Sequence, residues 1–463
     1  MRALIFLVVL NLCSLGRAQQ DVLPPAKNGA ATTVQLPTFG ISFDADGVLE
    51  LKTFSDPTGA LTQQRLAAAR VRLAHPVAQA SRLRKVSLVR LEKALRARLD
   101  ARQEPTEEMS KLAGLLQVEA IYCYPDRGDV VLVGPAEGWM EDLSGRTVGM
   151  RTRRPTLLLE DLAVALRAYP PGSQQRGFVG CTINPRPEGL ARLRQVQQQI
   201  PRTIPVAQRG PVTAEIARRV QASLGMAEVQ VFGVSERTHF ARVMIEADYR
   251  MKRIAIGVEP APVPMTTFAA ALTSARHGVL QRWWFTPAYD CAQASPDRLA
   301  MKLVGQGVQL QTEDKAILPS GMLQQAATKP GKATLAYAHS FTRQYEQIAA
   351  VRPCYAQLRQ LADLLIVAAF MRKHDWYGQA NWNADLLLDE RQYVLERLEN
   401  PVDAPVVVNA FWKRNRMFTP AGGGVSIEAE LALASETLRN AEELQELREN
   451  LPQAEGAQSW WWD

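Results

Sequence analysis

The sequence contains few of the residues that build metal and thiol sites. Its 463 residues include five histidines and five cysteines, with no CxxC pair and no HExxH motif. These absences exclude the structural zinc knuckle, the thioredoxin-type dithiol and the zincin metalloprotease. We therefore expect no metal site and no other cofactor.

The motifs of common nucleotide-binding and acyl-transfer enzymes are also incomplete. The segment Gly233–Arg237 begins a nucleophile elbow but lacks its second glycine. Gly331-Lys332 lacks the earlier glycine of a Walker A loop, and Gly305-Gln306-Gly307 has Leu310 where a dinucleotide fingerprint needs a third glycine. Our main hypothesis is a non-enzymatic binding or assembly component of the cell envelope. The alternative is an unrecognised glycan- or peptide-directed hydrolase whose site is assembled between domains.

Composition and charge indicate an ordinary folded protein. Hydrophobic residues make up 47% and charged residues 22% of the chain, which excludes wholesale disorder. Arginine greatly outnumbers lysine, which fits genomic composition at least as well as selection for phosphate binding. The net charge of +7 falls to +5 without residues 1–18, which hold two arginines and no acid. This excess is too small to predict specific nucleic acid binding.

The N-terminus has the form of a secretory signal peptide. Met1-Arg2 precedes an apolar run that begins at Ala3, and Gly16-Arg17-Ala18 is a small-x-small cleavage site. We predict cleavage near Ala18 and a periplasmic or secreted protein, with a retained N-terminal anchor as the alternative. No apolar run of about 18 residues follows, so we expect no transmembrane segment in the mature chain.

Export would permit disulfide bonds between the remaining cysteines. Two of them lie in strand-like segments, where a cysteine can equally be a small buried hydrophobe. The sequence leaves both possibilities open. The four cysteines are Cys123, Cys181, Cys291 and Cys354.

Hydrophobic periodicity alternates between helix and strand along the chain, which predicts an α+β fold, with α/β as the alternative. Pro260–Pro264 and Met322–Thr334 are the strongest linker candidates. The expected parts are a signal peptide (1–18), a lead-in with short strands (19–60), an α/β domain (61–258), a mainly β segment (265–330), a helix-rich C-terminal part (335–450) and a mobile tail ending in tryptophans (451–463). The lead-in strands are expected around the Asp46-Gly47 turn, and the apolar segment Tyr355–Lys373 is expected to be a buried core helix.

Two predicted helices carry charged residues that invite a functional interpretation. Lys85–Leu99 has a basic face, which is either a solvated surface or a polyanion site. Thr238 is expected to cap a helix that runs to about Ile256 and contains His239, Glu246 and Asp248. These three residues are the best candidate acid–base cluster. However, the two acids point about 200° apart on a helix, which favours i,i+4 salt bridges over catalysis.

Two further segments are candidate ligand sites. Trp382 between Asn381 and Asn383 combines the aromatic and amide groups of a glycan site, although an indole more often belongs to the core. Gly422, Gly423 and Gly424 could present backbone N–H groups to an oxyanion, or form a flexible turn. We expect an envelope protein or a glycan as the partner.

The tail ends with Trp460, Trp461 and Trp462, which are the candidate partner contacts. Leaving three indoles in water is costly, because each can bury well over ~100 Å². They are therefore expected to dock onto this chain, onto a partner or onto the envelope. We predict that removing residues 459–463 leaves the fold intact and reduces association with the envelope.

Several stretches between residues 60 and 430 resemble a known family. The family consists of secreted proteins of planctomycete bacteria built around one domain of unknown function, numbered fifteen ninety-eight. The resemblance implies secretion and a bacterial origin, and it implies no catalytic residue. The matching stretches are Ser81–Arg98, Gly134–Trp139, Glu160–Pro171, Gly180–Pro185, Thr238–Lys252 and Thr419–Ile427.

Overall fold

A computed structural model of the protein describes residues 38–174, 177–199, 205–273, 279–325, 329–409, 421–452 and 459–463. Within these residues the chain forms 15 α-helices and 18 strands in four sheets, so the predicted α+β class is confirmed. The expected signal peptide and the first part of the lead-in lie outside the described residues.

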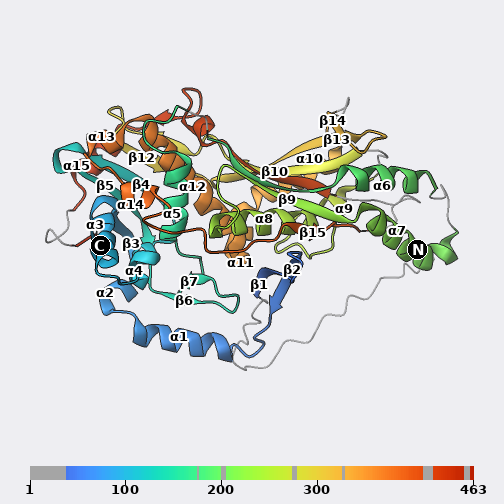
Figure 1. Ribbon diagram of the computed structural model, residues 1–463, viewed down its shortest axis with the longest axis horizontal. Coiled ribbons are helices and arrows are strands. Elements are labelled where there is room, and N and C mark those ends of the chain that lie inside the picture. The colour runs from blue at the N-terminus through green and yellow to red at the C-terminus, as the bar shows by residue number, and fades with distance from the viewer. Residues whose placement is uncertain are drawn as a thin grey trace, which may run out of the picture.

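One seven-stranded sheet, the β10 sheet, forms the right half of the molecule in Figure 1. In spatial order its strands are β14 (Leu323–Gln325), β13 (Val308–Ile317), β10 (Val279–Pro287), β16 (Ala421–Ile427), β8 (Val179–Pro185), β9 (Met226–Phe232) and β15 (Asp403–Pro405). Strands β10 and β16 are parallel, and all other neighbours are antiparallel.

A second seven-stranded sheet, the β5 sheet, lies in the left half of Figure 1. Its spatial order is β17 (Arg439–Asn440), β11 (Ala292–Ala294), β12 (Ala300–Leu303), β4 (Ala120–Tyr124), β5 (Asp129–Ala136), β3 (Ser81–Ser87) and β18 (Trp461–Trp462). Two hairpins complete the strands: β1 (Thr38–Phe43) with β2 (Leu49–Phe54), and β6 (Trp139–Glu141) with β7 (Thr147–Gly149).

The helices pack around and between these sheets (Figure 1). The longer ones are α1 (Ala60–Arg72), α3 (Leu88–Asp100), α5 (Leu159–Ala168), α6 (Pro187–Gln199), α7 (Arg209–Leu224), α8 (His239–Ala255), α10 (Lys332–Arg343) and α12 (Pro353–Lys373). The shorter ones are α2 (His75–Ala78), α4 (Glu107–Ser110), α9 (Phe268–Ala271), α11 (Tyr345–Val351), α13 (Trp376–Gln379), α14 (Asp385–Leu388) and α15 (Glu443–Glu449). Four 3-10 turns are η1 (Leu112–Gly114), η2 (Pro125–Arg127), η3 (Val206–Gln208) and η4 (Ala429–Leu433).

Both sheets combine strands from parts that the sequence analysis separates. The β10 sheet takes strands from 61–258, from 265–330 and from 335–450. The β5 sheet takes strands from these three parts and from 451–463. One cluster of buried hydrophobic residues runs through both sheets. The expected boundaries therefore do not coincide with the sheets, because strand pairing between distant segments decides the architecture.

Two local sequence signals are confirmed in the structure. The hairpin around Asp46-Gly47 forms, and the Thr238 hydroxyl accepts a hydrogen bond from the Ala241 N–H at 3.3 Å, as a helix cap should. The helix expected over Lys85–Leu99 is wrong at its start, because its first residues belong to β3 and pair with β5. Helix α3 begins at Leu88, where the Ser87 hydroxyl caps it.

Helix α12 lies between the two sheets (Figure 1), and 16 of its 21 residues are buried. It contacts α5 on the side of the β5 sheet and α8 on the side of the β10 sheet. It is long and apolar enough to cross a membrane, but 89% of its most apolar window is buried inside the protein. That burial fits the core helix that the sequence predicts for Tyr355–Lys373.

This apolar helix carries one buried carboxyl group, that of Asp363. Asp363 is 1% exposed, and neither of its carboxyl oxygens has a hydrogen-bond partner. The nearest charge is the Arg359 guanidinium, whose Nε lies 3.6 Å from Oδ2. Burial raises the pKa of Asp363 to about 7, although Arg359 opposes the shift.

We predict that Asp363 makes the protein less stable at pH 8 than at pH 5. Between about pH 4 and pH 7 the folded chain holds a proton that the unfolded chain has lost, so the free energy of unfolding falls as the pH rises. The loss between pH 5 and pH 8 should be about 2 kcal/mol. Thermal denaturation at both pH values should show a loss that is about 2 kcal/mol smaller in Asp363→Asn than in the wild type and in the exposed control Asp100→Asn, because other groups with a raised pKa, such as His239, are present in all three proteins. An unchanged pH profile in Asp363→Asn would contradict the assignment.

The terminal tryptophans dock onto this chain. Trp460 is buried, and β18 pairs with β3 as the outermost strand of the β5 sheet. The fully buried Arg84 donates from Nε and Nη2 to the Asp463 carboxylate at 2.8 and 2.9 Å, and its guanidinium lies 4.6 Å from the centre of the Trp461 ring. The mobile-tail expectation is thus wrong for residues 459–463, while residues 453–458 lie outside the described residues.

We predict that Asp463→Ala destabilises the fold by about 2 kcal/mol, because a buried guanidinium loses its carboxylate partner. The matched control is Glu443→Ala, which removes an exposed acid from α15. Urea denaturation of both variants gives the comparison. Removal of residues 459–463 should cost more than Asp463→Ala. Equal stability of the wild type and the truncated chain would show that the tail does not belong to the core.

Candidate functional site

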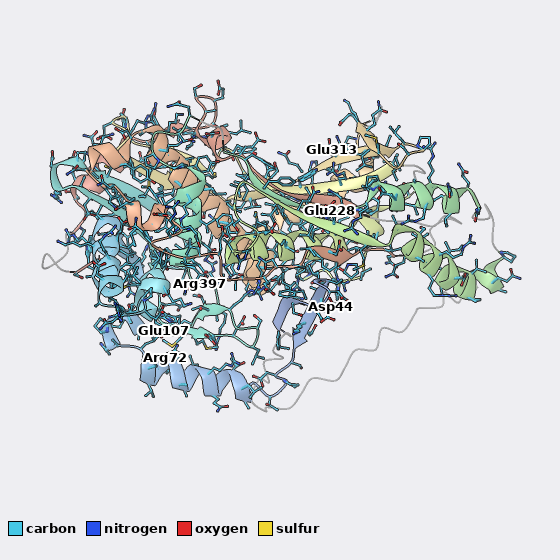
Figure 2. All side chains as sticks on the ribbon, in the orientation of Figure 1. Asp44, Arg72, Glu107, Glu228, Glu313 and Arg397 are labelled. Carbon is cyan, nitrogen blue, oxygen red and sulfur yellow. The ribbon has the colours of Figure 1, made fainter. Side chains whose placement is uncertain are left out.

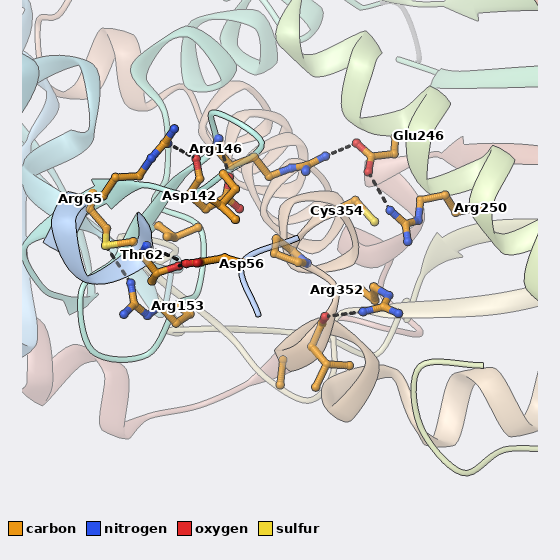
Figure 3. A pocket seen from close by; sticks show the side chains of 16 residues that line it. Asp56, Thr62, Arg65, Asp142, Arg146, Arg153, Glu246, Arg250, Arg352 and Cys354 are labelled. Atoms are coloured by element: carbon orange, nitrogen blue, oxygen red, sulfur yellow. Dashed lines mark hydrogen bonds and ion pairs between the residues drawn. The ribbon is translucent and has the colours of Figure 1, made fainter. Parts of the chain in front are cut away.

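A pocket of about 190 Å³ lies between two groups of segments (Figure 3). Helix α1 and the β6–β7 hairpin form one wall, and α8, α11 and the start of α12 form the other. Helix α1 is held to α4 by an ion pair of 3.2 Å between Arg72 and Glu107, which Figure 2 labels. Five arginines and three acids line the pocket: Arg65, Arg146, Arg153, Arg250 and Arg352, with Asp56, Asp142 and Glu246.

The three acids of the pocket already have hydrogen-bond or ion-pair partners within the protein. The Asp56 carboxylate accepts hydrogen bonds from the N–H and the hydroxyl of Thr62, both at 2.8 Å, and the Thr62 N–H lowers the pKa of Asp56. Asp142 Oδ1 accepts from the N–H and the hydroxyl of Ser144 inside the β6–β7 turn. Glu246 forms ion pairs with Arg146 and Arg250.

Two of the five arginines form no ion pair with a carboxylate within the described residues. Arg65 donates to the backbone carbonyls of Glu141 and Asp142. Arg153 donates from Nη1 to the Met140 sulfur at 2.8 Å, and the nearby Glu137 carboxylate stabilises its charge without a direct ion pair. With five guanidiniums and three carboxylates, the lining carries a formal excess of two positive charges. The pocket is therefore suited to an anion.

Two backbone features add to this preference. Arg153 has φ +60°, a left-handed conformation that is uncommon for a non-glycine residue and is found disproportionately at functional sites. Helix α12 begins at the pocket, since Arg352, Pro353 and Cys354 all line it. The positive end of the helix dipole therefore acts in the same direction as the guanidiniums.

The cysteine in this pocket is not a thiolate. Burial raises the pKa of Cys354 to about 12, so its thiol stays protonated at neutral pH. Cys123, Cys181 and Cys291 are also buried, and all four thiols are free. Of the two possibilities that the sequence leaves open, the structure shows the small buried hydrophobe.

A histidine with two neighbouring acids lies near the pocket without lining it. His239 Nδ1 is 2.9 Å from Asp161 Oδ2, and the side chain is 18% exposed. Burial opposes protonation of His239, but Asp161 and the adjacent Glu160 outweigh it, so its pKa is raised. Within the described residues no three His, Cys, Asp or Glu side chains are grouped to hold a metal ion.

One glutamine connects this histidine to the pocket. Gln357 of α12 accepts a hydrogen bond from Arg146 Nε through Oε1 at 2.9 Å. Its amide nitrogen lies 3.4 Å from His239 Nε2. A polar chain thus crosses the space between the sheets: Asp161, His239, Gln357, Arg146, Glu246 and Arg250.

One comparison with known proteins finds a family that part of this region is similar to. Residues 181–268 match the model of a family described as "Protein of unknown function (DUF1598)". No curated protein and no solved structure gives a significant match to the chain. The matched residues supply α8, with His239, Glu246 and Arg250, but not α1, the β6–β7 hairpin or α12. The family model therefore covers only the α8 part of one wall of the pocket.

The three residues of the predicted acid–base cluster, His239, Glu246 and Asp248, have different partners in the structure. Glu246 and Asp248 form the expected i,i+4 pairs, and Asp248 Oδ2 lies 2.7 Å from Lys252 Nζ. The salt-bridge interpretation is confirmed, although both pairs are buried and not solvated. His239 contacts Asp161 on α5, a partner that the sequence analysis does not find.

Trp382 belongs to the core. It is 5% exposed, stacks on Tyr377, and donates from Nε1 to the buried Glu92 carboxylate at 2.5 Å. Asn381 and Asn383 are exposed, so the three side chains do not form one surface. The glycan-site interpretation of this segment is wrong, because the indole N–H has a partner within the protein.

The three glycines form a buried strand, not a loop. Gly422, Gly423 and Gly424 lie in β16 between β10 and β8. Gly423 has φ +134°, and a Cβ there would lie 1.8 Å from the Trp283 carbonyl oxygen. A Cβ at Gly424 would lie 2.1 Å from the Cys181 carbonyl oxygen. Close backbone packing therefore explains the glycines, and both the oxyanion site and the flexible turn are wrong.

Proposed function

We propose that this is an exported protein of the bacterial cell envelope that binds a ligand bearing a doubly charged oxyanion in the arginine pocket. One observation carries the proposal: within the described residues Arg65 and Arg153 form no ion pair, while Glu246 pairs with Arg146 and Arg250. A guanidinium donates two parallel hydrogen bonds to an oxyanion, so two such groups match a dianion.

Export and envelope location rest on other evidence. The pattern of residues 1–18 supports a cleaved signal peptide. The resemblance to the planctomycete family supports secretion and a bacterial source. A phosphate- or carboxylate-bearing envelope glycan, or an envelope protein with such a group, is the expected partner.

A hydrolase is the second candidate, and one observation favours it. His239 lies against Asp161 and beside Glu160, which is the combination of a base and two acids that hydrolysis needs. Binding is nevertheless the better-supported function. His239 does not line the pocket, and the Cys354 thiol is protonated.

We predict that sulfate, a small dianion, binds to the wild-type protein and that Arg153→Gln weakens binding about tenfold or more, because a charge-assisted hydrogen bond contributes roughly 1.5–3 kcal/mol. Arg65→Gln should act in the same direction. The exposed neighbour Arg151 provides the matched control, and Arg151→Gln should stay within about twofold of the wild type. Isothermal titration measures all four proteins. Absent sulfate binding, or equal affinities throughout, would exclude the pocket as an anion site.

We predict that the mature protein begins at Gln19. Expression in a bacterial host with N-terminal sequencing of the envelope fraction gives the measurement. Ala18→Arg should block cleavage, because the residue before the cut must be small. An intact Met1 on wild-type protein in the envelope would instead support the retained anchor.

A further inference from the structure

One buried carboxylate, which does not itself line the arginine pocket, contacts the loop that carries Arg153. Glu137 directly follows β5 and is 3% exposed. Its Oε1 accepts hydrogen bonds from the N–H and the hydroxyl of Thr152, at 2.9 and 2.6 Å, and its Oε2 accepts from the Arg151 N–H at 3.2 Å. Charge-assisted hydrogen bonds of this kind are strong, so they fix the course of the backbone around the carboxylate.

The loop Gly149–Arg154, the Arg153 loop, closes around this carboxylate. The Gly149 N–H donates to the Arg154 carbonyl at 2.8 Å, and the Arg153 N–H donates to the Gly149 carbonyl at 3.1 Å. A Cβ at Gly149 would lie 1.9 Å from Glu137 Oε1, so a side chain there would displace the carboxylate. The Arg153 loop and the Glu137 side chain therefore form one tightly packed unit.

This unit explains the unusual backbone of Arg153. The φ of +60° persists in a non-glycine residue only where the surrounding structure enforces it. Here Gly149 holds the N–H of Arg153, and Glu137 holds the two residues before it. With its backbone fixed in this way, Arg153 lines the pocket, where its side chain lies beside that of Met140 (Figure 3).

The Arg153 guanidinium keeps donors for a ligand. Of its five N–H groups, one has a hydrogen-bond partner within the described residues, and this partner, the Met140 sulfur, is a weak acceptor. The Glu137 oxygens accept from Thr152 and Arg151 instead of from this guanidinium. Glu137 therefore holds the loop without occupying the donors that face the ligand.

We infer that Glu137 is a positioning residue of the arginine pocket, which fixes the Arg153 loop, and through it the Arg153 guanidinium, in the place where the oxyanion binds. Binding then does not have to order this part of the chain, and a preorganised donor binds more tightly than a mobile one. The inference rests on the proposed anion site. It adds a residue outside the pocket lining on which the affinity depends.

The direction of one effect separates positioning from a simple influence of charge. Glu137→Gln removes a negative charge near Arg153, which by electrostatics alone would tighten sulfate binding. If Glu137 positions the loop, this variant instead binds sulfate about fivefold more weakly, because its amide NH2 group faces the Arg151 N–H. The matched control Glu141→Gln removes an exposed acid of the β6–β7 hairpin and should stay within about twofold of the wild type. Isothermal titration at constant ionic strength gives each Kd.

A surface variant decides the question if Glu137→Gln does not fold. Thr152 is exposed, and Thr152→Val keeps its shape while removing the hydroxyl that donates to Glu137. This change should weaken sulfate binding about threefold, because the loop loses one of its hydrogen bonds to the carboxylate. Thr53 on β2 is also exposed and lies outside the pocket lining, so Thr53→Val should bind sulfate like the wild type.

A double-mutant cycle provides the readout that a merely structural role would not change. If Glu137 acts through Arg153, then Glu137→Gln and Thr152→Val have no further effect on the Kd in an Arg153→Gln background. Additive losses, or single variants that bind sulfate as tightly as the wild type or more tightly, would show that the inference is wrong while the anion site stands. If the wild type binds no sulfate, both the anion site and the inference are overturned.

Discussion

Burial of α12 is the constraint on which the rest of the structure depends. An apolar helix of 21 residues needs cover on all sides, and no single sheet can give it. Helices α8 and α10–α11 cover α12 on the side of the β10 sheet. Helix α5 covers it on the side of the β5 sheet. Aromatic rings complete this cover, since Tyr355 meets Phe285 and Phe341 at centroid distances of 5.7 and 5.3 Å. The two sheets therefore share one core.

The polar chemistry of the molecule follows from the same helix. Gln357, Gln360 and Asp363 lie on successive turns of α12, and each is buried. Gln360 donates to the carbonyls of Leu116 and Pro155, both at 2.7 Å, which ties the helix to segments near the β5 sheet. Gln357 instead meets charged side chains. The pocket forms where α12 begins, because there the apolar packing gives way to guanidiniums.

Sequence reasoning predicts a structural feature best where the interacting residues lie close together in the chain. The hairpin at Asp46-Gly47 and the cap at Thr238 are local, so a few neighbouring residues predict them. For Trp382 the sequence leaves a ligand site and the core as alternatives, because the partner that decides between them, Glu92, lies on another helix far away in the chain. The arginine pocket is harder still, since its lining comes from α1, the β6–β7 hairpin, α8 and α12. Its one local sign is the run Arg151–Arg154, which is ambiguous in an arginine-rich chain.

The pairing of β18 with β3 has a consequence for folding. Strand β3 is among the first strands in the chain and β18 is the last, so the edge of the β5 sheet closes only after nearly all of the chain is available. Contacts over such a separation form slowly, because a long loop must close first. Until then β3 presents unpaired backbone groups, and such an edge can pair with other chains. The pairing of β18 with β3 therefore ends the period in which a newly made molecule is vulnerable to aggregation through this edge.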